Sequence, residues 1–218
     1  MINLANLKKD QVSSAAQLAL PIFSEINNKI GILMPIGSWA LENEYLLNEF
    51  ANWRKVFMRL FLVQFTASVE STKSYLTNLS IAQQDRIFFA IYDADNQLVG
   101  HIGLSHITSE KAELDNIIRG RSARHPDIMY FAEKTLLCWA FERLLVKRVE
   151  AQVISKNFMV MSLHERFGFM IKKSMPLKKE YSENTLRYIT CPVDETTEKF
   201  HLNLIQVARQ EFYQSIQV

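Results

Sequence analysis

The strongest constraint on this fold is the stretch of residues 112–169, where a strand pattern passes into a basic loop and then into a helix pattern. The segment AELDNIIRG alternates apolar and polar residues, as a half-buried strand does, and ends in an Arg-Gly pair. The loop RSARHP follows, and DIMYFAEKTLLCWAFERLLV then takes up helical spacing. The basic loop therefore stands at a helix N-terminus, where backbone N–H groups, the helix dipole and guanidinium groups favour a bound phosphate.

The segments around this stretch predict a mixed α and β chain. Further strand patterns cover residues 29–36, 86–93, 98–107 and 148–154, and the turn ADNQ joins the second and third of these into an antiparallel hairpin. A last hairpin is expected from residues 168–175 and 185–191, with the loop PLKKEYSEN between them. Helices are expected after Ser38, from about Ser68 and after Asn157.

The two ends of the chain show helical apolar spacing. Residues 10–28 form one such segment, which Pro21 should kink or divide, and residues 194–217 form the other. We therefore expect an N-terminal helical extension over residues 1–28, a central domain over 29–192 and a C-terminal helix over 193–218. The C-terminal helix could pack on the domain or join two copies of the chain, so a homodimer stays open.

Composition limits the classes of function. Hydrophobic residues make up 48% of the 218 residues, which is enough for a full core, and the net charge is only +2. A balance this close to neutral gives no bulk attraction for nucleic acid or for a membrane surface, so we expect neither partner. Cys138 and Cys191 suggest neither a disulfide scaffold nor a metal site, and a cytoplasmic location is the simplest expectation.

At this point the order of elements resembles that of the GCN5-related N-acetyltransferases, the GNAT family. The resemblance covers residues 29–191. It rests on LVGHIGL leading into AELDNIIRG, on the basic loop with its helix, and on NFMVMSLHERFGF, which is similar to the family's closing motif. It implies an α+β chain with the α/β-type GNAT fold, in which helices flank a mostly antiparallel, centrally splayed mixed sheet, here with extra helices at both ends.

The resemblance also implies an acyl-CoA N-acyltransferase domain with acetyl-CoA as its co-substrate. Backbone groups of a splayed strand would hold the pantetheine, and the basic loop would hold the pyrophosphate. The family's second loop glycine is missing here, and arginines stand in its place, with Pro126 near the first helical position. The residues expected to bind the cofactor are Asn116, Ile117, Ile118, Arg119, Gly120, Arg121, Arg124, Met129 and Asn157.

Two of these cofactor assignments have simpler alternatives. The arginines would then form a solvated basic loop, although positive charge at a helix start is unfavourable unless an anion opposes it. Asn157 would then only cap the short helix that follows it.

Three residues are candidates for catalysis. Glu113 and Asp115 lie on one face of their strand and would take the proton from the acceptor's ammonium group. For Asp115 an almost equally good interpretation is that it satisfies local polar groups where the strands diverge. His164 stands where the family often has a tyrosine and would protonate the departing thiolate, or it would only pack there. His106 is a reserve candidate.

These features predict an enzyme that transfers acetyl from acetyl-CoA to the primary amine of a small acceptor by direct attack on the thioester. The phrases ELDNIIRG and LHERFGF look most like those of bacterial members that acetylate nucleotide-linked amino sugars. One alternative is an N-terminal or ribosomal-protein acetyltransferase. Another is a non-catalytic acyl-CoA-binding module. Residues 56–65 are mainly core in our interpretation, and an aromatic wall over a substrate groove is the alternative.

Overall fold

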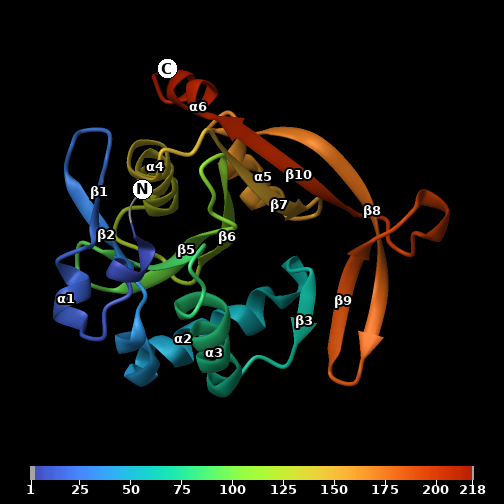
Figure 1. The fold of residues 1–218 in the computed structure, drawn as a ribbon, viewed down its shortest axis with the longest axis horizontal. Helices are drawn as coiled ribbons and strands as arrows, with labels where there is room; N and C mark the ends of the chain where they lie inside the picture. The colour runs from blue at the N-terminus through green and yellow to red at the C-terminus, as the bar shows by residue number, and fades with distance from the viewer. Residues whose placement is uncertain (1–2, 218) are drawn as a thin grey trace.

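A single ten-stranded sheet organises the computed structural model, which describes residues 3–217 (Figure 1). Its strand order is β1-β2-β4-β5-β6-β7-β10-β8-β9-β3, and within the described residues β6 and β7 are the one parallel pair. The strands are β1 (Leu20–Phe23), β2 (Lys29–Pro35), β3 (Val63–Phe65), β4 (Ile87–Asp93), β5 (Leu98–Ser105), β6 (Lys111–Arg119), β7 (Arg148–Ile154), β8 (Met170–Ser182), β9 (Thr185–Thr190) and β10 (His201–Ala208). This is the predicted mixed, mostly antiparallel sheet.

Helices pack on both faces of the sheet, and each face has its own apolar core. The helices are α1 (Val12–Ala16), α2 (Glu44–Phe57), α3 (Val69–Tyr75), α4 (Ile128–Trp139), α5 (Phe158–Glu165) and α6 (Arg209–Ser215). Successive residues of β4 show the two faces, because strand side chains alternate. Phe88 packs 5.8 Å from Phe50 of α2, and Phe89 packs 5.8 Å from Trp139 of α4.

The sheet is forked at its centre. Residues 111–114 of β6 pair with residues 148–151 of β7, and beyond that point β6 pairs with β5 alone while β7 pairs with β10. Asn116 sits on the diverging part of β6 with a left-handed φ of 51°, opposite a register shift between His101 and Gly103 of β5. The predicted splayed centre of the sheet is therefore confirmed.

The predicted helix over residues 10–28 is wrong beyond its first turns. The α1 helix spans only Val12–Ala16, and the segment Leu20–Phe23 forms the edge strand β1, paired with β2. Pro21 lies within this strand, which an edge position tolerates because its missing N–H is needed least there. Burial of Ile22, which is fully inaccessible, outweighs the helical spacing.

The predicted C-terminal helix is wrong over most of its length. Residues 201–208 form β10 at the interior of the sheet, between β7 and β8, and only α6 (Arg209–Ser215) is helical. The final hairpin also differs from the expectation. The β8 strand continues through the expected loop to Ser182, so its first half pairs with β10 and its second half with β9.

Helix starts were predicted at Ser68, after Ser38 and near Pro126, and the structure confirms only the first of these three. Ser68 and Ser71 form a capping box at the start of α3, as expected. The helix expected after Ser38 begins instead as a short 3-10 turn, and α2 is capped by Asn43, whose side chain accepts from the Leu46 N–H. Pro126 precedes the N-cap residue of α4 rather than occupying its first helical position.

We predict that Ile205→Ala in β10 lowers the free energy of unfolding by about 2–5 kcal/mol, because this fully buried side chain would leave a cavity at the centre of the sheet. The neighbouring change Gln206→Ala, on the less buried side of the same strand, should stay within about 0.5 kcal/mol. Urea unfolding followed by circular dichroism measures both. Equal small effects would mean that the C-terminal segment is peripheral to the fold.

Candidate active site

The Asn116 bulge is held from both sides of the backbone. Its carbonyl oxygen accepts a hydrogen bond of 2.6 Å from Nδ1 of His101, and its side-chain amide donates to the Tyr75 hydroxyl at 2.7 Å. Burial lowers the pKa of His101 to about 4, so this ring is neutral and carries its hydrogen on Nδ1. The His101 ring packs between Phe50 and Phe88 at 4.7 and 4.9 Å, which makes it a structural residue.

The predicted pantetheine strand lies on the open edge of the fork. Beyond residue 114, β6 no longer pairs with β7, so no strand of the described chain pairs with the edge of residues 116–119 that faces β7. A ligand with amide groups can hydrogen-bond to such an edge as an added strand would. The fold thus leaves one edge of these four residues open to such a ligand.

The arginines of the basic loop are opposed by carboxylates, against the expectation of unopposed charge. Arg121 forms an ion pair of 2.7 Å with Glu49 of α2, and Arg124 forms one of 3.0 Å with Asp95. Arg119 is exposed and reaches the backbone carbonyl of Arg121. A phosphate would therefore have to compete with Glu49 and Asp95 for two of the three side chains.

Gly120 has a packing role in this loop. A Cβ atom at this position would lie 1.9 Å from the indole ring of Trp53, so the glycine lets the loop pass against α2. The loop leads into α4, whose N-cap residue Asp127 makes no side-chain capping hydrogen bond, and Met129 in the first turn is buried. The start of α4 keeps the polarity that suits an anion, although its loop lacks a second glycine.

The closing motif has an exposed start, at Phe158 and Met159, but its histidine lies inside the protein. His164 is only 1% exposed, and its Nδ1 lies 2.6 Å from a carboxylate oxygen of Glu133. Glu133 is a residue of α4 and is completely buried. This placement argues against the predicted general-acid role, because the ring links α5 to α4 in the core. Asn157 caps α5 by accepting from the Val160 N–H at 3.4 Å, which is the simpler of its two interpretations.

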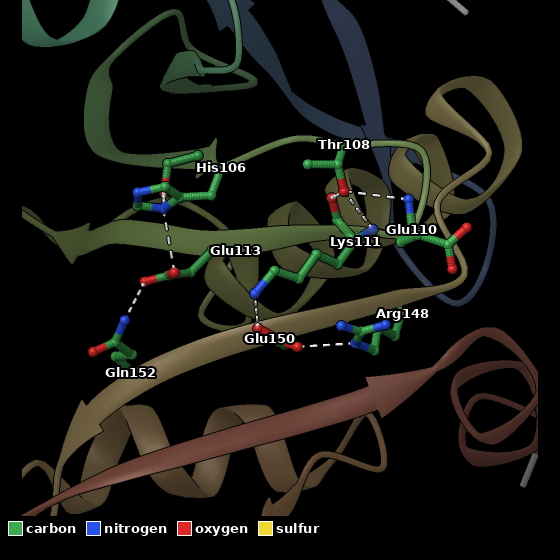
Figure 2. A network of polar contacts seen from close by, with 9 residues as sticks. His106, Thr108, Glu110, Lys111, Glu113, Arg148, Glu150 and Gln152 are labelled. Carbon is green, nitrogen blue, oxygen red and sulfur yellow. Dashed lines mark hydrogen bonds and ion pairs between the residues drawn. The ribbon is translucent and has the colours of Figure 1, made fainter.

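The two predicted carboxylates lie on the polar face of the forked strands. Figure 2 shows Glu113 between His106, at 3.3 Å, and Gln152, which donates to it at 3.1 Å. Burial is the main cause that raises the pKa of Glu113 above its usual value. Asp115, two residues along the strand, forms an ion pair of 3.5 Å with Arg86.

Glu150, the carboxylate beside Glu113, has a basic partner on each of its two oxygens. Glu150 of β7 receives hydrogen bonds from Lys111 at 2.6 Å and from Arg148 at 2.9 Å (Figure 2). Burial raises the pKa of Glu150, but these two hydrogen bonds outweigh it and leave that pKa below its usual value. Glu113 and Glu150 face each other across the parallel pair, yet only Glu113 is biased toward accepting a proton.

A cavity of about 90 Å³ opens next to the bulge, on the face covered by α2 and α3. It is lined by Phe50, Arg54, Phe65, Ser71, Thr72, Tyr75, Leu76, Phe88, His101, Asn116 and Ile118. The Tyr75 hydroxyl accepts from Arg86 at 3.1 Å as well as from Asn116, so its own hydrogen is available to a ligand. Burial raises the pKa of Tyr75 to about 12, which keeps the phenol protonated.

Sequence reasoning missed Arg54 and Tyr75. They lie on α2 and α3, about 40 to 60 residues before β6, and no spacing rule connects them with the fork. The one usable signal was the aromatic stretch of residues 56–65. Phe65 does line the cavity, as the aromatic-wall alternative proposed, whereas Val56 is 69% exposed and belongs to neither interpretation.

Residues 39–170 match the family model described as "Acetyltransferase (GNAT) domain". The chain belongs to the GNAT family. As a GNAT enzyme it is an N-acetyltransferase that uses acetyl-CoA as its co-substrate, and the alternative of a non-catalytic module is not favoured. No curated protein sequence shows significant similarity to it.

Solved structures of GNAT enzymes share the fold of this GNAT chain. Spermidine N-acetyltransferase from Vibrio cholerae, in complex with CoA and spermine, is 16% identical, and the match covers 85% of this chain and 99% of that one, with a TM-score of 0.63. The N-acetyltransferase PseH from Campylobacter jejuni is 16% identical over 83% of this chain and 99% of that one, with a TM-score of 0.53. At such identities the likeness concerns the fold.

Among residues 3–217, no helix combines the length and the apolar character that crossing a membrane demands. Over the same residues, no group of three or more His, Cys, Asp or Glu side chains is arranged to hold a metal ion.

We predict that His164→Ala destabilises the GNAT domain by about 3 kcal/mol or more, because it leaves the buried Glu133 carboxyl without its partner. Combining it with Glu133→Gln should restore part of the loss. Urea unfolding of the two single variants and the double variant measures the coupling, and His106→Ala, on a 60% exposed side chain, serves as the control. An unchanged stability together with a lost alkaline limb of the pH profile would instead support the general-acid role.

Proposed function

We propose that this GNAT enzyme acetylates the primary amine of a small acceptor bound on the α2–α3 face, beside the fork between β6 and β7. One observation carries the proposal: the cavity at the Asn116 bulge opens on the sheet face that bears Asp115 and Glu113. An acceptor there would stand next to the strand edge that suits the pantetheine. The arrangement brings the two substrates together, which lowers the entropic barrier to their reaction.

Glu113 is the proposed general base. An amine arrives mainly as ammonium and must lose a proton before its nitrogen can attack the thioester carbonyl. The raised pKa of Glu113 makes its carboxylate a stronger base than an exposed glutamate, and its position beside Gln152 and His106 fixes its orientation. Attack forms the C–N bond, and the C–S bond then breaks to release the CoA thiolate.

Tyr75 is the proposed donor for the departing thiolate. It replaces His164 in this role, because its hydroxyl hydrogen is free and its oxygen is held by Arg86 and Asn116. Its pKa of about 12 keeps the phenol protonated, so the hydroxyl can donate a hydrogen bond that stabilises the negative charge on the departing sulfur. Asp115 then serves mainly to hold Arg86 in place.

The cofactor would bind to the predicted strand and loop, with indirect roles for Gly120 and Asn157. The backbone of residues 116–119 would hold the pantetheine, and the start of α4 with Arg119 and Arg121 would hold the pyrophosphate. Arg121 would exchange Glu49 for phosphate when the cofactor binds. Gly120 acts through packing, and Asn157 acts through the cap of α5.

A nucleotide-linked amino sugar is the acceptor that the sequence phrases favour, and the proposal retains it. The last hairpin offers Lys172 and Lys173, which are exposed, whereas Lys178 and Lys179 are paired with Glu195 and Glu198. A polyamine is the competing acceptor, since a GNAT structure of the same fold holds spermine. A cytoplasmic location and a homodimer stay predictions.

We expect release of CoA thiol when the protein meets acetyl-CoA and one class of acceptor. The panel comprises amino-sugar nucleotides, simple amino sugars, polyamines and short peptides, and a calorimetric titration with CoA runs beside it. Tyr75→Phe should lower kcat by about 10²-fold, and exposed Tyr181→Phe should change neither kcat nor the affinity for CoA. CoA binding without turnover on any acceptor class would contradict the proposal.

We predict that kcat/KM of the wild-type enzyme falls as pH drops through the raised pKa of Glu113, because only the carboxylate form accepts the proton. Glu113→Gln should remove this acidic limb and lower kcat/KM by about 10²-fold near neutral pH. Glu110→Gln, an exposed position that pairs with Lys147, is the matched control. An acidic limb that survives in Glu113→Gln would show that another group is the base.

A further inference from the structure

The guanidinium of Arg54, which lines the cavity beside the bulge, has few hydrogen-bond partners among the described residues. Among the described residues, its only hydrogen bond runs from Nη2 to the backbone oxygen of Val63 at 2.9 Å. Its Nε–H group is inaccessible to water and has no partner within residues 3–217. The guanidinium lies 3.5 Å from the ring centroid of Phe61, and a stack of this kind covers its flat face but leaves the N–H groups at its edge to donate.

The charge of Arg54 is not neutralised by any described residue. Burial lowers its pKa to about 10, which still leaves it protonated at neutral pH. Asp115, the carboxylate whose charge raises the pKa of Arg54, is already in an ion pair with Arg86. The residues that line the cavity include no acid, so the cavity is positive on balance. A half-buried cation without a counter-ion is costly, and a ligand that supplies the negative charge removes that cost.

The cavity is also small. Its volume of about 90 Å³ is well below the ~150 Å³ that holds a benzene molecule, so it takes a group of only a few heavy atoms. Phe50, Phe65 and Phe88 supply apolar lining, and Arg54 and Asn116 supply N–H donors. A planar or tetrahedral oxyanion on a short carbon stem fits the size of the cavity, and it offers an anion to the N–H donors and a carbon chain to the apolar lining.

We propose that Arg54 binds an oxyanion of the acceptor, a carboxylate or a phosphate carried a few bonds from the amine that is acetylated. The inference rests on the proposed function, because it assigns the cavity to the acceptor. It selects small amines that carry negative charge. It also separates this enzyme from one that acetylates polyamines, whose several ammonium groups would be repelled by Arg54 in the cavity.

Paired acceptors that differ only in the oxyanion test the proposal. The carboxylate pair is 4-aminobutyrate and 4-aminobutanamide, the phosphate pair is glucosamine 6-phosphate and glucosamine, and spermidine represents the polycations. We expect the charged member of at least one pair to have a kcat/KM about tenfold or more above its neutral partner and above spermidine. The pair that shows the effect identifies the oxyanion.

Variants then assign the preference to one side chain. Arg54→Gln should reduce the preference to about one, and Arg54→Lys should keep part of it, since a point charge remains but the planar fork of donors is lost. Arg59→Gln, an exposed arginine in the turn after α2, should keep the wild-type preference. Wild-type enzyme that uses neutral and polycationic acceptors as well as charged ones would overturn the proposal, as would an unchanged preference in Arg54→Gln.

A second measurement does not depend on turnover or on the folding of a variant. The Nε–H resonance of Arg54 is followed by ¹⁵N NMR in the wild-type complex with CoA while propionate, methyl phosphate or propionamide is added. Movement with propionate or methyl phosphate, and none with propionamide, supports the proposal. A resonance that stays fixed with all three overturns it. Absence of CoA binding and of thiol release would instead contradict the proposed function. Those two measurements are separate from the titration of the Arg54 resonance, so the two failures can be told apart.

Discussion

The left-handed conformation of Asn116 is the constraint on which the centre of this molecule depends. A residue with a φ of 51° in the middle of a strand shifts the register of β6 against β5 and turns its outer edge away from β7. Such a conformation is costly for a non-glycine residue and persists only where neighbours fix it. His101 holds the carbonyl oxygen and Tyr75 holds the side-chain amide, so the core and α3 both support the fork.

Because the same contacts pin the bulge and shape the cavity, the structural and chemical parts of the site are connected. The Tyr75 hydroxyl satisfies Asn116 and Arg86 and still keeps a hydrogen for a ligand. The neutral His101 ring fills the space between Phe50 and Phe88 and forms one wall of the cavity. A substitution in this group would therefore alter the strand fork and the proposed acceptor site together.

Charges near the fork are paired to very different degrees. Glu150 is held by Lys111 and Arg148, and Arg121 is held by Glu49, so these groups mainly stabilise the structure until a substrate replaces a partner. Glu113 and Arg54 are the exceptions. Glu113 has a pKa raised by burial, and Arg54 has no described counter-ion. Groups left in such states by a fold are the ones for which substrate binding or proton transfer is favourable.

Local pattern was enough for much of the sheet and for the family. Strands β6 and β7 were predictable because they alternate polar and apolar residues, strands β2, β4 and β5 because they are apolar runs of seven or eight residues, and the order of the motifs identified the GNAT fold. The same reasoning failed for β1 and β10, where helical spacing of apolar residues coincided with a strand that tertiary burial stabilises. Ile205 is buried because β7 and β8 flank it, and the pattern of neighbouring residues in the sequence does not reveal this pairing.

The sequence by itself determined the basic loop and the polar strand that carries Glu113 and Asp115, since both lie within one continuous stretch, and its resemblance to the GNAT family implied the splayed sheet. Only the tertiary structure decided that His164 faces Glu133 in the core and that Arg54 and Tyr75 stand beside Asn116. The physical reason is that a side chain's chemistry depends on its burial and its partners. For these residues the partners come from helices and strands far away in the chain.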